Sequence, residues 1–294
     1  MSDSIVPHRH IHICRCRRHR RAVIPGLRLA WSLAIALAMV ACSPADQTAV
    51  QPPAPQAAAS SATPFAAIPS STRAMLEAAE PVVADHAMVA TAQHLATRVG
   101  VDILRQGGNA VDAAVAVGYA EAVVHACCGN IGGGGFMNLH LADGRSLFLN
   151  FREKAPLKAT PTLFQDKDGN VVEGRSTNTY LGVGVPGTVM GLNTALAAYG
   201  TMSLKQVMAP AIKLARDGYV LTEQDVRIFN TSTEHFAAEP NVAAIFLDDG
   251  KPWKVGDRLV QTQLAHTLEQ IAEGGTDAFY KGPIAAAIVK ASDA

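Results

Sequence analysis

Hydrophobic residues recur with helical spacing in the segment that begins near residue 91. Leu95, Val99 and Ile103 follow one another at intervals of four, so they fall on one face of a helix. The pair Gly107-Gly108 comes next, and glycine tolerates the left-handed backbone that often ends a helix. The pattern predicts a helix over residues 91–106.

A second helix is predicted over residues 110–124. Asn109 precedes it and Asp112 follows three residues later, a spacing typical of a capping box. The segment is apolar nearly all round, which indicates burial on several sides.

The pattern then changes to a period of two, which favours β-strands. Residues 136–141 and 146–151 flank Asp143-Gly144, a strong turn signal, and predict a β-hairpin. Alternation puts Leu147, Leu149 and Phe151 on one face and Phe148, Asn150 and Arg152 on the other.

Beyond residue 160 the pattern is mostly helical. Predicted helices cover residues 188–199, 204–217 after Ser203, 259–272 before Gly274-Gly275, and 283–294. The last pattern stops without a C-cap glycine or a polar tail, so we expect the chain to be truncated from a longer one.

Charge and composition separate the front of the chain from the rest. Of 294 residues, 49% are hydrophobic, which excludes disorder throughout. The first 41 residues hold seven arginines and one acid; without them the chain has 18 basic and 24 acidic residues, a net charge of −6. We therefore expect no nucleic-acid partner.

Residues 1–41 are predicted to be a signal peptide. Arginines precede an apolar run over residues 29–40, which is too short to span a bilayer. The small residues before Cys42 resemble the bacterial lipobox, in which the cysteine is acylated. We expect a lipoprotein at the periplasmic face of a bacterial membrane; a plain signal peptide cut near Ala41 is the alternative.

The remaining chain divides into a tether and a folded part. Residues 42–80 are rich in Pro, Ala, Ser and Gln and are expected to form a flexible spacer. Residues 81–294 form the globular region. Its only cysteines, Cys127 and Cys128, are adjacent, so a bridge between them is unfavourable and we expect two small buried side chains.

Three further motifs favour plain structural roles. Gly182, Gly184 and Gly187 match G-x-G-x-x-G, but Pro186 and the lack of a preceding strand favour a tight turn that opens a helix. The run at residues 132–135 favours close approach of another backbone or a small substrate. We predict no metal site, because the segment from His125 to Cys128 is too cramped for three tetrahedral ligands.

Arg152 is the main candidate for chemistry. It ends a strand within an apolar stretch, where a guanidinium is costly to bury without a partner and its planar fork matches a carboxylate. From the pattern alone, a structural ion pair and recognition of an anionic substrate both stay open.

Several long motifs resemble the gamma-glutamyltransferases. They are Met88-Val89-Ala90-Thr91, the segment from Asp102 to Ala116, Gly129-Asn130-Ile131-Gly132-Gly133-Gly134-Gly135-Phe136-Met137, Phe151-Arg152-Glu153-Lys154-Ala155-Pro156, Val185-Pro186-Gly187-Thr188, and the segment from Ala209 to Gly218. The similarity covers nearly the whole globular region, in order.

The resemblance implies an α+β fold of the N-terminal nucleophile (Ntn) hydrolase class, an αββα sandwich of which the front of the large subunit is present. It implies a precursor that cleaves itself, and a threonine nucleophile at the start of the small subunit, outside this chain. That threonine attacks the γ-glutamyl amide of glutathione, and the acyl group passes to water or to an acceptor amino acid or peptide. No cofactor is implied.

For the residues present, the resemblance implies that Arg152 holds the α-carboxylate of the γ-glutamyl group and that Glu153 orients it. The small subunit is the expected partner, and the chain alone is expected to be inactive. A cephalosporin-acylase-like amidase is a rival within the family. A tethered lipoprotein without catalysis is the rival if the gene ends at Ala294.

Overall fold

Helix α3 (Ala110–Val124) forms the centre of the core in the computed structural model, which describes residues 80–293. The predicted signal peptide, Cys42 and nearly all of the tether lie outside the described residues. Residues 85–293 belong to one compact unit. Ten of the fifteen α3 residues are buried, as the all-round apolar pattern predicted.

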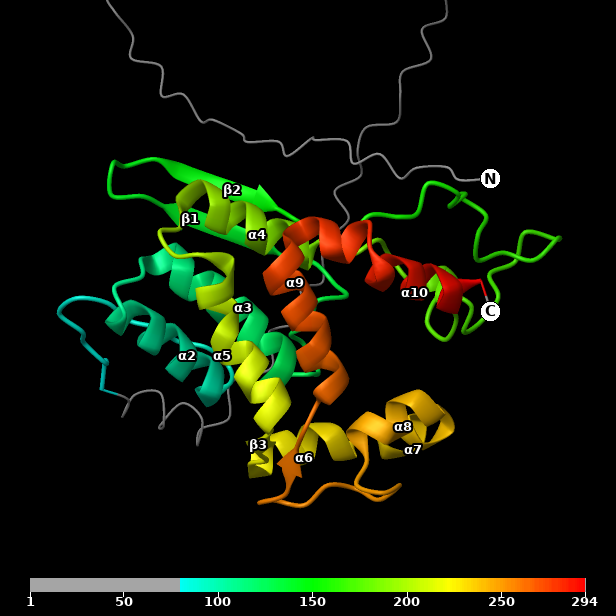
Figure 1. The fold of residues 1–294 in the computed structure, drawn as a ribbon. Coiled ribbons are helices and arrows are strands. Elements are labelled where there is room, and N and C mark those ends of the chain that lie inside the picture. The colour runs from blue at the N-terminus through cyan, green and yellow to red at the C-terminus, as the bar shows by residue number, and fades with distance from the viewer. Residues whose placement is uncertain (1–79, 294) are drawn as a thin grey trace, which may run out of the picture. The chain divides into compact units, whose positions relative to one another are not determined.

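Three helices surround α3 (Figure 1). They are α2 (His94–Arg105), α4 (Thr188–Tyr199) and α5 (Leu204–Asp217). Helix α2 begins three residues later than predicted, because the side chain of Gln93 caps it by accepting a hydrogen bond from the backbone of Leu95. The capping box of α3 is present as predicted.

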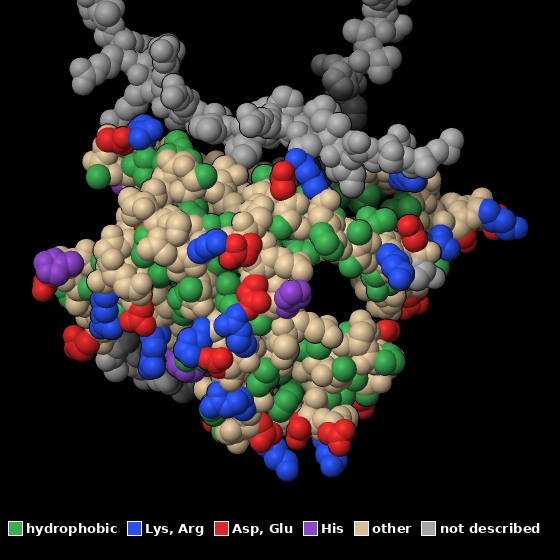
Figure 2. All heavy atoms as spheres, in the orientation of Figure 1, with side chains coloured by type: hydrophobic (Ala, Val, Ile, Leu, Met, Phe, Trp, Pro, Cys, Tyr) green, Lys and Arg blue, Asp and Glu red, His purple; other side chains and the backbone are tan. Residues whose placement is uncertain are grey.

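Helix α9 (Thr262–Tyr280) packs along α5 and leads to α10 (Pro283–Ser292). The predicted start at Leu259 is wrong, because Leu259 lies in strand β4 (Arg258–Leu259), which pairs with β3 (Tyr219–Val220). The predicted break at the glycine pair appears as a kink at Gly275, where φ is 64°. On the face seen in Figure 2, acidic and basic side chains of α5 and α9 intermix, and Arg216 pairs with Glu269.

Three short helices lie between β3 and β4, in a stretch where the sequence predicted no element. They are α6 (Glu223–Asn230), α7 (Thr233–Ala238) and α8 (Pro240–Phe246). Among the helices described, none is both long and apolar enough to cross a membrane.

The predicted hairpin is present as β1 (Phe136–His140) and β2 (Ser146–Asn150). The antiparallel register pairs Phe136 with Asn150 and His140 with Ser146. One face of the hairpin is covered, with Leu149 buried and β2 in contact with α4. The rings of Phe136 and Phe148 stack on the other, exposed face, with their centroids 5.6 Å apart.

Candidate functional site

The end of β2 is held by an extra pair of backbone hydrogen bonds beyond the hairpin. The Phe151 N–H donates to the Gly135 carbonyl at 3.0 Å, and the Gly135 N–H donates to the Phe151 carbonyl at 3.3 Å. The ring of Phe151 packs against Gly191 of α4, where a Cβ would overlap it. This packing fixes the point at which Arg152 leaves the sheet.

Two glycine segments enclose the backbone of residues 151–153. A Cβ on Gly134 would lie 2.6 Å from the Phe151 carbonyl oxygen and 2.7 Å from the Glu153 nitrogen. The Gly133 carbonyl accepts hydrogen bonds from the N–H groups of Gly187, at 2.7 Å, and Thr188, at 3.0 Å. The prediction that the glycine run permits close backbone approach is confirmed.

The G-x-G-x-x-G segment forms the other side of this enclosure. Before Gly187 the chain forms a 3₁₀ turn (Tyr180–Gly182), and Val185 makes a two-way backbone bridge to Lys154. Gly187 is the N-cap of α4. The prediction of a tight turn that opens a helix is confirmed, and the glycines serve packing against the strand end.

Arg152 is exposed and ion-paired, not enclosed by apolar side chains as its sequence surroundings suggested. Its Nε donates to Oε2 of Glu153 at 2.7 Å, and two thirds of the side chain (66%) is exposed. Its backbone N–H donates to Oδ1 of Asn150 at 3.0 Å. The side chain is exposed because it leaves on the uncovered face of the hairpin. Of the three nitrogens of the Arg152 guanidinium, only Nε has a hydrogen-bond partner among residues 80–293.

Glu153 is held as a carboxylate by its surroundings. The pKa of Glu153 is lowered by hydrogen bonds from its own backbone N–H, from the Arg152 guanidinium and from the Gly134 N–H. An ionised carboxylate on Nε leaves the two terminal NH₂ groups of Arg152 as a fork of donors. That fork has the geometry to receive a second carboxylate in a bidentate manner.

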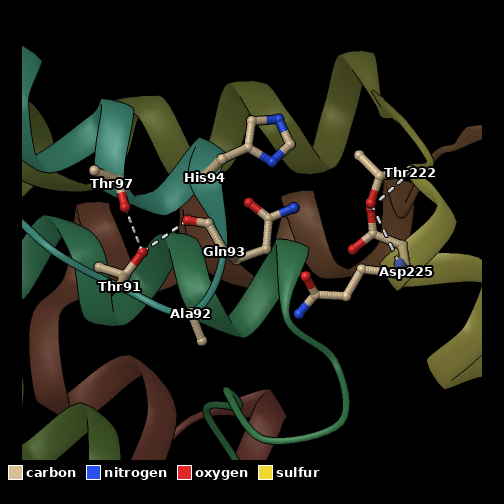
Figure 3. Close-up of a pocket in the computed structure, with 8 residues that line it drawn as sticks. Thr91, Ala92, Gln93, His94, Thr97, Thr222 and Asp225 are labelled. Atoms are coloured by element: carbon tan, nitrogen blue, oxygen red, sulfur yellow. Dashed lines mark hydrogen bonds between the residues drawn. The ribbon is translucent and has the colours of Figure 1, made fainter. Parts of the chain in front are cut away.

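A separate polar pocket of about 310 Å³ lies between the N-terminal ends of α2 and α6 (Figure 3). Gln93, Thr97 and Asp225 line it, and the Gln93 amide points into the space beside Asp225. Arg152 does not line this pocket, so the pocket is distinct from the strand-end site.

The cysteine pair differs from the prediction. Cys127 and Cys128 are both free and exposed, because the turn that follows α3 carries them off its packed face. The expectation that this segment is too cramped for a metal site stays a prediction. The ligand atoms of His125, Cys127 and Cys128 lie within 4.8 Å of one another. Sequence spacing alone could not show how close these atoms lie, because their distances depend on how the turn folds.

Comparison with known proteins identifies the family. The family model for gamma-glutamyltranspeptidase matches residues 96–294. The chain belongs to the gamma-glutamyltranspeptidase family. It is 56% identical over 210 residues to a glutathione hydrolase proenzyme from Pseudomonas sp. strain A14, covering 71% of this chain and 36% of that protein. The corresponding Escherichia coli proenzyme is 50% identical over 213 residues, with the same two coverages.

Other members of the family are more distant. The acylase ACY 1 proenzyme of Pseudomonas sp. strain SE83 is 38% identical over 215 residues, covering 71% of this chain and 38% of the acylase. The chain therefore spans little more than a third of the length of these relatives.

Solved structures confirm the fold. The gamma-glutamyltranspeptidase of Helicobacter pylori matches with a TM-score of 0.70 and 44% identity, covering 72% of this chain and 61% of that one. The gamma-glutamyltranspeptidase of Pseudomonas nitroreducens, complexed with L-DON, matches with a TM-score of 0.66 and 38% identity. That match covers 72% of this chain and 62% of the other. The described residues thus contribute a helical core and a hairpin to an Ntn-hydrolase fold of mixed helix and strand content. The roles of Arg152 and Glu153 stay predictions.

Proposed function

We propose that this chain is the substrate-binding front part of a glutathione hydrolase that also acts as a gamma-glutamyltransferase. The observation that carries the proposal is the guanidinium of Arg152. Its Nε is held by Glu153 at 2.7 Å, and its terminal NH₂ groups make no hydrogen bond to a described residue. A planar fork of this kind matches the α-carboxylate of a γ-glutamyl group. The identity of 50–56% to glutathione hydrolase proenzymes supports the same substrate.

In this proposal the chain binds and orients the substrate. Arg152 grips the α-carboxylate, and Glu153 holds the arginine in place, while the two glycine segments keep the strand end rigid. A threonine nucleophile of the small subunit, with its own α-amine as the base, attacks the γ-amide and forms an acyl-enzyme. Water or an acceptor amino acid or peptide then takes the acyl group. Without that subunit the chain binds but does not catalyse.

The experiment that tests the proposal uses the complete gene product that contains this chain. We expect it to cleave itself into two subunits and to release glutamate from glutathione. Glutaryl amides, the substrate class of the acylase-like rival, should be turned over far more slowly, in keeping with the lower identity of 38% to an acylase. A product that never cleaves itself, or that prefers glutaryl amides, would overturn the proposal.

We further propose that Cys42 is acylated and anchors the protein at the periplasmic face of a bacterial membrane. The lipobox-like residues before Cys42 support this. Growth of the expressing cells with a labelled fatty acid should label the wild-type protein and leave the Cys42→Ala variant unlabelled. Equal labelling of both would contradict the anchor.

A further inference from the structure

The turn after α3 brings three metal-ligating side chains close together. The N–H groups of Cys128 and Gly129 both donate to the His125 carbonyl, at 3.0 and 2.8 Å. A Cβ on Gly129 would overlap the Glu121 carbonyl, so the turn closes tightly onto the helix end. The conformation of the turn, and not the sequence spacing, brings the ligands together.

The distances suit a tetrahedral ion. Zinc bonds of about 2.3 Å to sulfur and 2.0–2.1 Å to nitrogen place neighbouring ligand atoms about 3.6–3.8 Å apart. A ring nitrogen of His125 and the sulfurs of Cys127 and Cys128 lie within 4.8 Å of one another, so side-chain rotations that move these atoms by about 1 Å would close the site. Both cysteines are free and exposed, which leaves an entry path for the ion.

Glu121 supplies the outer partner that a metal-binding histidine needs. Nδ1 of His125 lies 2.9 Å from Oε2 of Glu121, one helical turn before it. That oxygen is buried and receives no hydrogen bond from the described residues, so it is available to the imidazole beside it. A carboxylate on Nδ1 fixes the ring and leaves Nε2 as the nitrogen available to a metal.

We propose that His125, Cys127 and Cys128 bind one thiophilic divalent metal ion, Zn²⁺, with the fourth coordination position open to water. Two thiolates and one imidazole are the ligands that such ions prefer over hard cations such as Mg²⁺. Binding releases the two thiol protons to solvent as the two metal–sulfur bonds form. The site does not depend on the proposed function of Arg152.

The test uses the full 294-residue chain with Cys14, Cys16 and Cys42 replaced by serine, so that Cys127 and Cys128 are its only thiols. The reduced chain is titrated with Co²⁺, whose thiolate charge-transfer absorption reports these two sulfurs, and Zn²⁺ is then added in competition. We expect one equivalent of Co²⁺ to give the absorption, one equivalent of Zn²⁺ to abolish it, and Mg²⁺ to leave it unchanged.

Variants in the same background separate the ligands from their surroundings. Cys127→Ser, Cys128→Ser and His125→Gln should each weaken binding more than about 100-fold, whereas Glu121→Gln should weaken it about 10- to 100-fold. His140→Gln, which changes a histidine on the exposed face of the hairpin, should leave binding unchanged. Circular dichroism checks that each variant folds. The proposal is overturned if the background chain, with both thiols titrating as reduced, gives no absorption.

Discussion

Gly187 lies so close to Phe151 that a methyl group on its Cα would overlap the carbonyl oxygen of Phe151. The same glycine donates its N–H to the Gly133 carbonyl at 2.7 Å. One residue therefore joins the glycine run to the end of β2, directly before Arg152. The position of Arg152 depends on this contact.

We expect Gly187→Ala to destabilise the chain by about 2–3 kcal/mol, because the added methyl cannot fit against backbone atoms that the hairpin fixes. Urea denaturation measures the change. Gly132→Ala is the matched control, since Gly132 belongs to the glycine run that Gly187 contacts, but a Cβ there meets nothing within 4 Å. It should change stability by less than about 0.5 kcal/mol. Equal stabilities of the two variants would contradict the close approach.

Asp112 is a buried carboxylate whose charge is stabilised by four donors. It accepts the Asn109 N–H at 2.8 Å, the Thr201 N–H and hydroxyl at 2.9 and 2.6 Å, and the Met202 N–H at 3.0 Å. Burial alone would raise the pKa of Asp112, but these hydrogen bonds outweigh it and lower the pKa below its ordinary value of 3.8.

We therefore expect Asp112→Asn to cost about 2–3 kcal/mol at neutral pH. A carboxyl with a lowered folded-state pKa contributes stability above its unfolded pKa and loses that contribution as pH falls through the folded value. The difference in unfolding free energy between the wild type and the variant should thus be constant near neutrality and shrink below pH 3.8. Denaturation at a series of pH values measures it.

The exposed Asp143 in the hairpin turn is the control for that series. Asp143→Asn should change the unfolding free energy by less than about 1 kcal/mol, because exposed ion pairs contribute little to stability. If the loss of unfolding free energy in Asp112→Asn stays constant down to the lowest pH, the carboxylate charge does not stabilise the fold.

The hydroxyl of Tyr280, in α9, caps the N-terminus of α4 in place of an N-cap side chain. Gly187 has no side chain to satisfy the first turn of that helix, and the N–H of Met190 donates instead to the Tyr280 hydroxyl at 3.3 Å. The hydroxyl in turn donates to the Pro186 carbonyl at 2.8 Å.

Tyr280→Phe removes both hydrogen bonds and keeps the ring, so we expect a loss of about 1–2 kcal/mol in unfolding free energy. Tyr180→Phe, at a position that is half exposed, should be neutral. If thermal denaturation shows the two variants to be equally stable, the hydroxyl of Tyr280 does not cap α4.

Local signals were enough to predict much of this fold. The capping box at Asn109 and Asp112 and the turn at Asp143-Gly144 involve residues within a few positions of one another, and both formed as predicted. The three helices between β3 and β4 have eight residues or fewer, too few to show a clear helical period.

Features set by distant contacts could not be predicted. The Tyr280 hydroxyl caps a helix 90 positions away in the sequence. Leu259 begins an apolar periodic run, yet it pairs with Tyr219 in a sheet. The sequence was enough to single out Arg152 as a candidate site residue. Its exposure and its pairing through Nε to Glu153 could be seen only in the structure.

The most direct test of the account is the KM for glutathione of the complete gene product carrying Arg152→Lys. Lysine keeps the charge but loses the bidentate fork, so we predict that KM rises about 10- to 100-fold. Arg145→Lys is the matched control, since its Nε also lies 2.7 Å from a neighbouring carboxylate, that of Asp143 in the hairpin turn. It should leave KM unchanged. A wild-type KM in the Arg152→Lys enzyme would contradict the claim that Arg152 binds the glutamyl carboxylate.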